Sequence, residues 1–258
     1  ASSQFVSGLL LAAPHFDVGL HLVHTGEHLP SLPHIDMTIE ALSRRGIRIE
    51  RPAVGEWLVE AGVPRAKEIA IEPDLSNAAP FLAAALVAGG SVTVPGWPAS
   101  TPQAGDQLRR ILPAFGATVS PDGARLTVSG DGTIRAVHLD VPEAGELAPT
   151  LVGLAALADG PSEITGIGHI RHHETDRIAA LVAEIRRLGG QAEELPDGIA
   201  VTPVPLAGAR WESYADHRMA TTGALIGLRV PGVTIDDIGT TAKTLPEFTQ
   251  LWEGMLTR

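Results

Sequence analysis

The sequence predicts a mixed α/β (α+β) fold in which small α-β-α-β-β units repeat, with the helices inside and the sheets facing outward. One observation is a helical stretch rich in Ala and Leu that recurs roughly every 70 residues, a period too long for a solenoid of short repeats. The second is that each stretch leads into a short β pattern and then a further helix. We expect these units to form two domains, of which the first is incomplete.

Each unit opens with a helix whose apolar composition suits the inside of a domain. The strand patterns that follow these helices are GLHLVHTG, SVTVPGW, SEITGIG and VTIDDIG. We therefore expect helix–strand pairs in chain order. The opening helices are expected within residues 2–14, 75–90, 146–160 and 217–232.

The second helix of a unit has one apolar face and ends at a glycine, the residue that most easily adopts the left-handed conformation after a helix. These glycines are Gly46, Gly116 and Gly189 in the first three units. The stretch that ends at Gly189 shows the helical spacing most clearly. Its apolar positions are Ile178, Leu181, Val182, Ile185 and Leu188.

Hairpins close two of the units. We expect their turns at Asp122-Gly123 and Asp197-Gly198, because both dipeptides favour two-residue hairpin turns. The first unit has the looser sequence RIERPAVGEWLVEAG at the same place, and the fourth ends at its second helix without closing strands.

A domain boundary is expected near Glu72-Pro73, after a strand at 67–73 that would close the first unit. Residues 1–72 would then form the last unit of one domain, and residues 73–258 a second domain of three units, the last of which lacks its closing strands. The single leading unit is expected to be the end of a domain that begins outside this chain.

Composition excludes several classes of protein. The chain has 258 residues, 44% of them hydrophobic, which is enough for one large or two moderate cores. The absence of cysteine excludes disulfides and thiolate chemistry within these residues. A net charge of −11 argues against a nucleic-acid partner. No apolar run approaches the roughly 20 residues of a membrane helix, so we expect no membrane partner.

Polar motifs gather where helices begin: SSQ, GELAP and DHR at opening helices, and HHETDR at a second helix. A helix N-terminus attracts anions, because its N–H groups are unpaired and its dipole is positive. Simpler explanations stay open at this point. Ser2, Ser3 and Asp216 are ordinary capping residues, and Glu174 and Arg177 have the spacing of a surface ion pair on one helix face.

A metal site is a further alternative for the histidines of this stretch. Only His169 and His173 approach the i, i+4 spacing of helical metal ligands, whereas His172 does not. Gly168 and Ile170 suggest that His169 lies in the loop before the helix, and no other ligand motif supports a metal. The sequence therefore predicts no metal site.

Taken together, SSQF, SLPHID, GIGHIRHHETDRI, YADHRMA and TTAKTLPEF resemble the motifs of the 5-enolpyruvylshikimate-3-phosphate (EPSP) synthase family, in the same order and spacing. The resemblance covers the whole chain. It implies the enolpyruvyl transferase fold, in which two similar domains, each of three α/β units, close on substrates. It also implies a cytoplasmic transferase of the shikimate pathway that uses phosphoenolpyruvate and shikimate-3-phosphate, without a metal or an organic cofactor.

The resemblance also implies roles for individual residues. Glu174 would be the acid that serves phosphoenolpyruvate, and Glu146 the base for the hydroxyl group. Arg177 and Arg218 would bind the substrate carboxylate, whereas Lys243 would contact the phosphate that leaves and take part in catalysis. The remaining substrate-binding positions implied by the motifs are Ser2, Ser3, Gln4, Ser31, His34, His169, His173 and His217.

Some positions depart from the commonest family pattern. His173 stands where many members have Lys, His34 where they have Tyr, His169 where they have Asn, and Glu146 where they have Asp. The motifs of the family's N-terminal part are not found here. We therefore expect this chain to be a C-terminal part that is inactive alone, that has the N-terminal part of the enzyme as its partner and that is monomeric when complete.

Two other functions remain open from the sequence. A sister enzyme that transfers enolpyruvyl to UDP-N-acetylglucosamine shares the fold but lacks ETDR and DHRMA at these places. A non-catalytic binding domain would need the charged residues at the helix starts to be solvated caps only.

Overall fold

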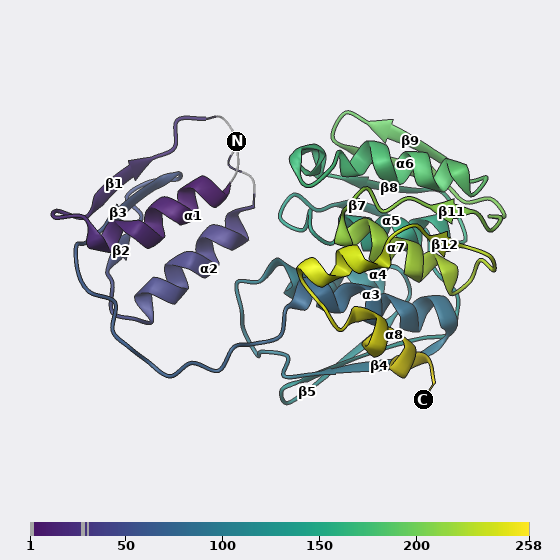
Figure 1. Ribbon diagram of the computed structural model, residues 1–258, viewed down its shortest axis with the longest axis horizontal. Helices are drawn as coiled ribbons and strands as arrows, with labels where there is room; N and C mark the ends of the chain where they lie inside the picture. The colour runs from purple at the N-terminus through teal and green to yellow at the C-terminus, as the bar shows by residue number, and fades with distance from the viewer. Residues whose placement is uncertain (1–2, 27–28, 30, 258) are drawn as a thin grey trace. The chain divides into compact units, whose positions relative to one another are not determined.

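The computed structural model describes residues 3–26, 29 and 31–257. The chain divides into two compact units (Figure 1). The first comprises Ala1–Ile71 with Ser100–Ala104, and the second comprises Glu72–Ala99 with Gly105–Arg258. Each unit has a hydrophobic core of its own.

The first unit is a small two-layer α/β structure. Its helices are α1 (Ser3–Ala12), the 3-10 turn η1 (Ala13–His15) and α2 (Leu32–Ser43), and its strands are β1 (Leu20–Val23), β2 (Ile49–Glu50) and β3 (Glu56–Val59). The strands form an antiparallel sheet in the order β1-β3-β2, and α1 packs against α2. Both helices begin at the same end of the unit (Figure 1). The core contains Leu10, Ile35, Leu42, Trp57 and Val59.

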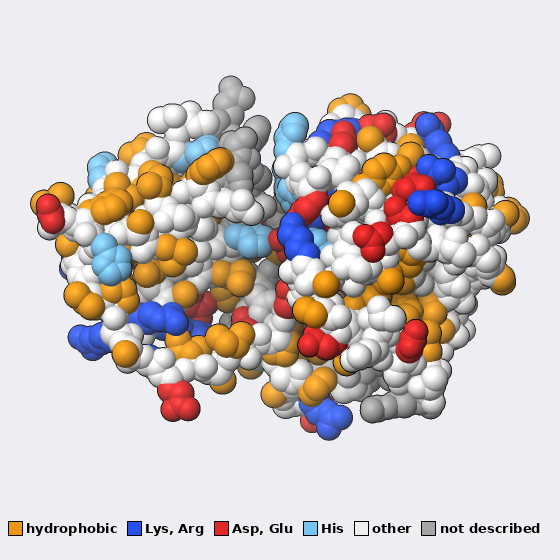
Figure 2. All heavy atoms as spheres, in the orientation of Figure 1, with side chains coloured by type: hydrophobic (Ala, Val, Ile, Leu, Met, Phe, Trp, Pro, Cys, Tyr) orange, Lys and Arg blue, Asp and Glu red, His pale blue; other side chains and the backbone are white. Residues whose placement is uncertain are grey.

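Apolar side chains also lie on the surface of the first unit (Figure 2). Phe5 on α1 is 76% exposed, although Val6 and Leu10 of the same helix are buried. The unit thus buries one side of α1 and leaves apolar groups on the other. Other exposed apolar residues of the first unit are Leu9, Leu11, Phe16, Val18 and Val23.

The second unit is built around three buried helices: α3 (Leu75–Ala88), α5 (Ala148–Ala156) and α7 (His217–Gly227). They pack against one another, and every residue of α5 is buried. The guanidinium of Arg229 donates to the carbonyls of Val87, Gly132 and Leu157 at 2.5, 2.6 and 3.4 Å. Because these contacts join the C-terminal ends of α3 and α5 to the segment after α7, the three helices run parallel and begin at one common end.

Each of these helices packs against a sheet on its outer side. The first sheet has the order β4-β6-β5, the second β7-β8-β10-β9, and β11 pairs with β12. In the first sheet Val92, Val94 and Val119 pack against the core while their neighbours in β4 and β5 are exposed, so this sheet has one face on the core and one towards solvent. The strands are β4 (Gly90–Pro95), β5 (Thr118–Asp122), β6 (Arg125–Gly130), β7 (His138–Asp140), β8 (Ser162–Thr165), β9 (Gln191–Leu195), β10 (Gly198–Thr202), β11 (Arg210–Trp211) and β12 (Thr234–Ile235).

The second helices of the units complete the layers. They are η2 (Ala104–Gln107) with α4 (Leu108–Ala114), η3 (Gly168–His172) with α6 (Arg177–Arg187), and η4 (Ile238–Lys243) with α8 (Phe248–Leu256). Phe248 and Trp252 of α8 lie against Phe81 of α3, each with ring centroids 5.5 Å apart. The last helix is therefore anchored on the central bundle.

The predicted fold class and the opening helices are confirmed, as are the glycine stops: Gly46, Gly116 and Gly189 all have positive φ. The apolar face expected for α6 is buried. The predicted α-β-α-β-β pattern of the units, however, lacked two strands. Strands β7 and β11 precede α5 and α7 and pair in parallel with β8 and β12.

Two local predictions were wrong. Residues 67–73 form no strand, and Ile71 in this segment is 88% exposed, since no neighbouring strand pairs with it among the described residues. The hairpin turns lie one residue away from the expected positions. Gly123-Ala124 follow Asp122 in one, whereas Pro196-Asp197 precede Gly198 in the other. Gly198 is the first residue of β10, where it pairs with Thr165 and Leu195, and a Cβ there would meet the carbonyl of Ile164 at 2.2 Å.

Within the described part of the chain, no helix combines the length and the apolar character needed to cross a membrane.

Candidate functional site

Acidic side chains stand at the common starting end of the three parallel helices. Asp74 caps α3 by accepting from the amides of Ser76 and Asn77, both at 2.9 Å, and Asp216 caps α7 by accepting from the amide of Arg218 at 2.8 Å. Glu146 lies two residues before the first residue of α5. The helix dipoles add positive potential at this end, which favours carboxylates or bound anions.

Arg177, the first residue of α6, is the centre of this cluster. Its side chain is only 2% exposed, and Asp216 binds it side-on, with Nε–Oδ2 at 2.7 Å and Nη2–Oδ1 at 3.2 Å. Nη2 also donates to Glu174 at 2.8 Å, and Nη1 lies 2.9 Å from Nδ1 of His173. These bonds engage all but one of the five N–H groups of a guanidinium. Arg177 can therefore offer little more than one N–H to a ligand in this arrangement.

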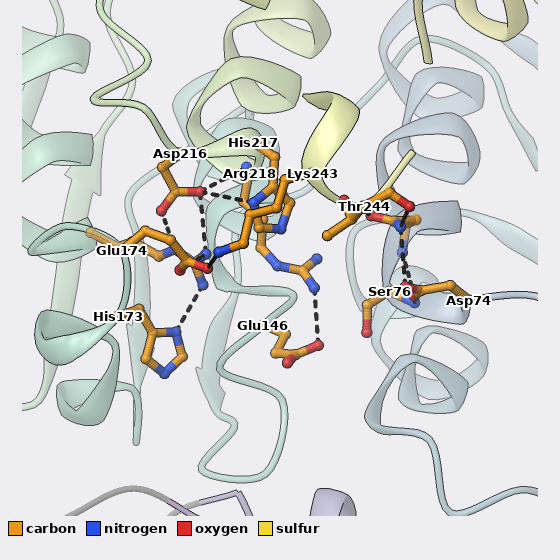
Figure 3. Close-up of polar contacts among 12 residues, drawn as sticks. Asp74, Ser76, Glu146, His173, Glu174, Asp216, His217, Arg218, Lys243 and Thr244 are labelled. Atoms are coloured by element: carbon orange, nitrogen blue, oxygen red, sulfur yellow. Dashed lines mark hydrogen bonds and ion pairs between the residues drawn. The ribbon is translucent and has the colours of Figure 1, made fainter. Parts of the chain in front are cut away.

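Glu174 is shared between two cations. One carboxylate oxygen accepts from Arg177 and the other from the ammonium of Lys243, whose side chain is 53% exposed (Figure 3). Burial alone would raise the pKa of Glu174. The hydrogen bond from Lys243 and the charge of Arg177 outweigh burial and lower this pKa to about 2. Glu174 is therefore ionised here, as a proton acceptor rather than a donor.

Arg218, on the first turn of α7, pairs with Glu146, with Nη2–Oε2 at 3.0 Å (Figure 3). Burial lowers the pKa of Arg218, but a guanidinium stays protonated in proteins. This pair uses only one N–H of the guanidinium, so Arg218 keeps more donors for a ligand than Arg177 does.

The site histidines are neutral near pH 7. Burial lowers the pKa of His173 to about 4, and the charges of Arg177 and of His169 act in the same direction. Burial likewise lowers the pKa of His217 to about 4, with the charge of Arg218 adding to it, and burial lowers the pKa of His169. Since Nδ1 of His173 accepts from Arg177, its proton lies on Nε2.

His169 and His217 are closely surrounded by other residues of the site. The rings of His169 and His173 meet edge to face with centroids 5.8 Å apart, and a Cβ on Gly145 would approach Nε2 of His169 to 2.2 Å. Nδ1 of His217 is buried and makes no hydrogen bond to a described residue. No group of three or more His, Asp or Glu side chains suited to a metal ion occurs among the described residues.

A strained turn places Asp216. The amide of Asp216 donates to the carbonyl of Ser213 at 2.9 Å, and the two residues between them, Tyr214 and Ala215, have φ of 55° and 53°. Positive φ at both central residues is the requirement of a type I′ turn, in which Gly and Asn are usual. Residues with a Cβ adopt this conformation at a cost of roughly 1–2 kcal/mol each.

The loop that carries Lys243 is held from the start of α3. The side-chain amide of Asn77 donates to the carbonyl of Thr244 at 3.2 Å, and the hydroxyl of Thr244 donates to the side-chain oxygen of Asn77 at 3.2 Å. These two hydrogen bonds fix Thr244, which directly follows Lys243 at the end of η4.

The sequence-predicted residues Glu146, His169, His173, Glu174, Arg177, His217, Arg218 and Lys243 all lie in the second unit, and ion pairs or ring contacts join most of them. The expectation that Glu174 and Arg177 share a helix face was wrong: α6 begins at Arg177 and is capped by Asp176, so Glu174 lies before the helix. The pair forms from that preceding segment instead.

The predicted residues of the first unit lie near the starts of its helices. Ser3 is buried at the beginning of α1, and Gln4 is exposed. Ser31 precedes α2 with a φ of 57°, and His34 lies in the first turn of that helix. Ser2 falls outside the described residues.

Sequence reasoning missed three features of the site. Asp216 was considered only as a cap, yet it is the main partner of Arg177. Asn77, which tethers Thr244, carried no signal in the sequence. Glu184 did carry one, because it is a charged residue within the buried face of α6.

The chain resembles known proteins over nearly its whole length. The profile of the family described as EPSP synthase (3-phosphoshikimate 1-carboxyvinyltransferase) matches residues 1–252. A curated 3-phosphoshikimate 1-carboxyvinyltransferase from Kocuria rhizophila is 53% identical over 252 residues. This match covers 97% of the chain but 57% of the relative, so the chain spans little more than half the length of that protein.

Solved structures share the fold. An EPSP synthase from Acinetobacter baumannii superposes with a TM-score of 0.77 at 24% identity, covering 99% of this chain and 60% of that one. The enolpyruvyl transferase NikO from Streptomyces tendae gives a TM-score of 0.67 at 19% identity, covering 88% of this chain and 53% of that one.

Proposed function

The chain belongs to the EPSP synthase family, and on that premise we propose that it carries the proton-transfer and phosphoenolpyruvate-binding groups of a 3-phosphoshikimate 1-carboxyvinyltransferase. The reaction joins the 5-hydroxyl oxygen of shikimate-3-phosphate to the central carbon of phosphoenolpyruvate while the methylene carbon takes up a proton. Loss of a proton and of phosphate then restores the double bond. The enzyme would work in the cytoplasm as part of the shikimate pathway.

The observation that carries the proposal is the alternation of cations and carboxylates at one end of the helix bundle. Lys243, Glu174, Arg177 and Asp216 form a continuous chain of ion pairs, and the backbone of Arg218 joins the same Asp216. Each cation is neutralised internally. An anionic substrate would compete with these carboxylates for the same cations. A carboxylate that loses its cation binds a proton more readily, so substrate binding would raise the pKa of the carboxylates.

The geometry supports different roles for the two arginines. Arg218 keeps most of its N–H groups for the carboxylate of phosphoenolpyruvate, because it uses one on Glu146. Arg177 would contribute one N–H and mainly hold Glu174 and Asp216 in place. Lys243 is half exposed and would bind the phosphate that leaves. Glu146, the ion-pair partner of Arg218, would accept the proton of the 5-hydroxyl group.

Glu174 would become an acid only after the substrate binds. When Lys243 turns from Glu174 to a phosphate group, the carboxylate loses the strongest of the contacts that lower its pKa, and burial then raises that pKa. The carboxyl group could then protonate the methylene carbon and remove a proton in the second step. His169, His173 and His217 would act as neutral hydrogen-bonding groups. Ser2, Ser3 and Ser31 would bind the phosphate of shikimate-3-phosphate, and His34 would be a further substrate-binding group. Gln4, like Lys243, would contact the phosphate that is transferred.

The test is phosphate release from both substrates by two proteins. One is the 258-residue chain, which we expect to be inactive alone. The other is a fusion in which the N-terminal part of the Kocuria rhizophila relative, the part outside the match, precedes residue 1. We expect the fusion to release phosphate, and Glu174→Gln to reduce its turnover by roughly 100-fold or more, the scale of losing a general acid.

The matched control is Arg210→Gln, because Arg210 is 65% exposed and, among the described residues, forms an ion pair with Glu212 alone. It should leave the fusion active. Phosphate release by the 258-residue chain alone would contradict the proposal that turnover also needs the N-terminal part of the enzyme. Full turnover by the Glu174→Gln fusion would return Glu174 to a structural role. Activity of the fusion with UDP-N-acetylglucosamine instead of shikimate-3-phosphate would assign the sister reaction.

A further inference from the structure

A fully buried carboxylate, that of Glu184 on α6, takes no part in the reaction proposed above. It is 0% exposed and accepts three hydrogen bonds: from the hydroxyl of Tyr214 at 2.7 Å, from the amide of Glu212 at 2.9 Å and from Nε of Arg187 at 3.0 Å. A buried charge is tolerated only when it is paired and hydrogen-bonded in this way. Two of its three donors belong to the segment that leads to Asp216.

This segment is the strained turn that carries Asp216. Tyr214 and Ala215 both have positive φ, a conformation that persists only where the surroundings impose it. Glu184 holds the turn at two places, the backbone before it and the side chain within it. The amide of Ser213 is held in addition by Asp236 at 2.8 Å.

The same helix also holds the end of the turn. Arg177 and Glu184 are seven residues apart on α6, which places them on one face two turns from each other. Arg177 binds the carboxylate of Asp216, whereas Glu184 binds Glu212 and Tyr214. One face of α6 therefore fixes both ends of the segment 212–216.

We propose that Glu184 and Tyr214 are positioning residues for the Asp216–Arg177 pair. The hydrogen bond from the Tyr214 hydroxyl to Glu184 stabilises the turn. The turn then orients the carboxylate of Asp216 towards Nε and Nη2 of Arg177. With that edge occupied, the guanidinium faces Glu174 and His173 in one orientation. The relevance to catalysis rests on the function proposed above, but the geometric claim does not.

The experiment follows the Nε–H proton of Arg177 by NMR in the 258-residue chain. Tyr214→Phe removes only the hydroxyl from a side chain that is 37% exposed, so the variant should fold. We expect its Arg177 Nε–H to exchange with water about tenfold faster, the scale of losing one hydrogen bond. Glu184→Gln should have a larger effect in the same direction. Arg110→Gln is the control, because Arg110 donates to Gln107 at the exposed start of α4 and contacts neither Glu184 nor Tyr214.

The indole N–H of Trp97 is the internal reference, since it donates to Asp106 at 2.7 Å in another part of the unit. Faster exchange at Arg177 with unchanged exchange at Trp97 supports the positioning role. Equal acceleration at both protons would show a loss of global stability only and would overturn it. Unchanged Arg177 exchange in Tyr214→Phe would overturn it as well, even if Glu184→Gln does not fold.

Tyr214 provides a second readout, because it is the only tyrosine in the sequence. Burial and the hydrogen bond to Glu184 raise its pKa. In protein with ¹³C-labelled tyrosine, the single ring resonance should titrate at lower pH in Glu184→Gln than in the wild type. The same midpoint in both proteins would contradict the contact. Neither readout requires turnover, so absence of the proposed activity would leave this result intact.

Discussion

Arg177 and Asp216 lie 39 residues apart in the chain and form a side-on ion pair in which both side chains are almost completely buried, at 2% and 0% exposure. Asp216 also caps α7, so one carboxylate joins the start of α6 to the start of α7. The pair therefore does more than neutralise charge. It fixes the place where α6 and α7 begin, and with it the positions of Glu174 and Arg218.

Asp216→Asn should destabilise the protein by about 3 kcal/mol or more, because removing one partner leaves the other charge buried without compensation. The measurement is the free energy of unfolding in urea. Glu50→Gln is the control, since it breaks a pair with Arg48 whose side chains are 50% and 66% exposed. That change should stay within about 0.5 kcal/mol. Equal losses in both variants would contradict the central position given to Asp216.

The ion pairs of Glu174 predict how stability depends on pH. Its pKa is lowered from 4.5 to about 2 on folding, so the unfolded chain binds the proton more readily. The contribution is thus present above pH 4.5 and is lost as the pH falls towards 2. The stability difference between wild type and Glu174→Gln should shrink over this range in urea unfolding. A difference that stays constant with pH would show that Glu174 is not ion-paired.

The same contacts predict that Lys243→Gln raises the pKa of Glu174. The hydrogen bond from Lys243 is the strongest contribution that lowers this pKa, and burial opposes it. NMR of the ¹³C-labelled Glu174 carboxyl group in wild type and variant measures the change. If both proteins titrate alike, Lys243 does not control the protonation of Glu174.

His173 and His217 should titrate far below an ordinary histidine. Their pKa values are lowered from 6.5 to about 4, mainly by burial, so the unfolded state binds protons that the folded state does not. Their contribution to stability is therefore complete above pH 6.5 and declines as the pH falls towards 4. NMR titration of the ring protons, assigned with His173→Gln and His217→Gln, checks this. Midpoints near 6.5 would mean that the rings are solvated.

Much of the fold could be predicted because the relevant signals are local. The Ala and Leu composition of 148–156 indicated a helix buried on all sides, and Gly189 indicated a helix end. The short parallel strand at Arg210–Trp211 could not be predicted, since its stability comes from the pairing with Thr234–Ile235 rather than from its own sequence. The exposed segment around Ile71 looked like a strand by composition but has no described partner.

The site was predictable in its residues but not in its pairings. Motifs brought Glu174, Arg177, Arg218 and Lys243 to attention one by one. Which carboxylate holds which cation depends on contacts between residues far apart in the chain, such as Arg218 with Glu146, 72 residues away. The lowered pKa of Glu174 follows from such contacts, so the family resemblance implied an acid where the structure has an ionised carboxylate.

Arg229→Met tests the parallel arrangement of α3, α5 and α7. Arg229 donates to backbone carbonyls at the C-terminal ends of α3 and α5, where a cation also complements the helix dipoles. Loss of these charged hydrogen bonds should cost about 2–4 kcal/mol in urea unfolding. Arg210→Met, at an exposed arginine, should cost little. Comparable small losses in both variants would contradict the role of Arg229.

The most direct test of the proposed site is the binding of phosphoenolpyruvate to the 258-residue chain, followed by ³¹P NMR titration. We expect weak binding to the wild type, because most cations of the site are already paired. Lys243→Gln and Arg218→Gln should each weaken it by roughly 10–100-fold, the scale of losing a charge-assisted hydrogen bond, and Arg210→Gln should not change it. If Lys243→Gln and Arg218→Gln bind as tightly as Arg210→Gln, these cations do not hold the substrate and the site proposed here is wrong.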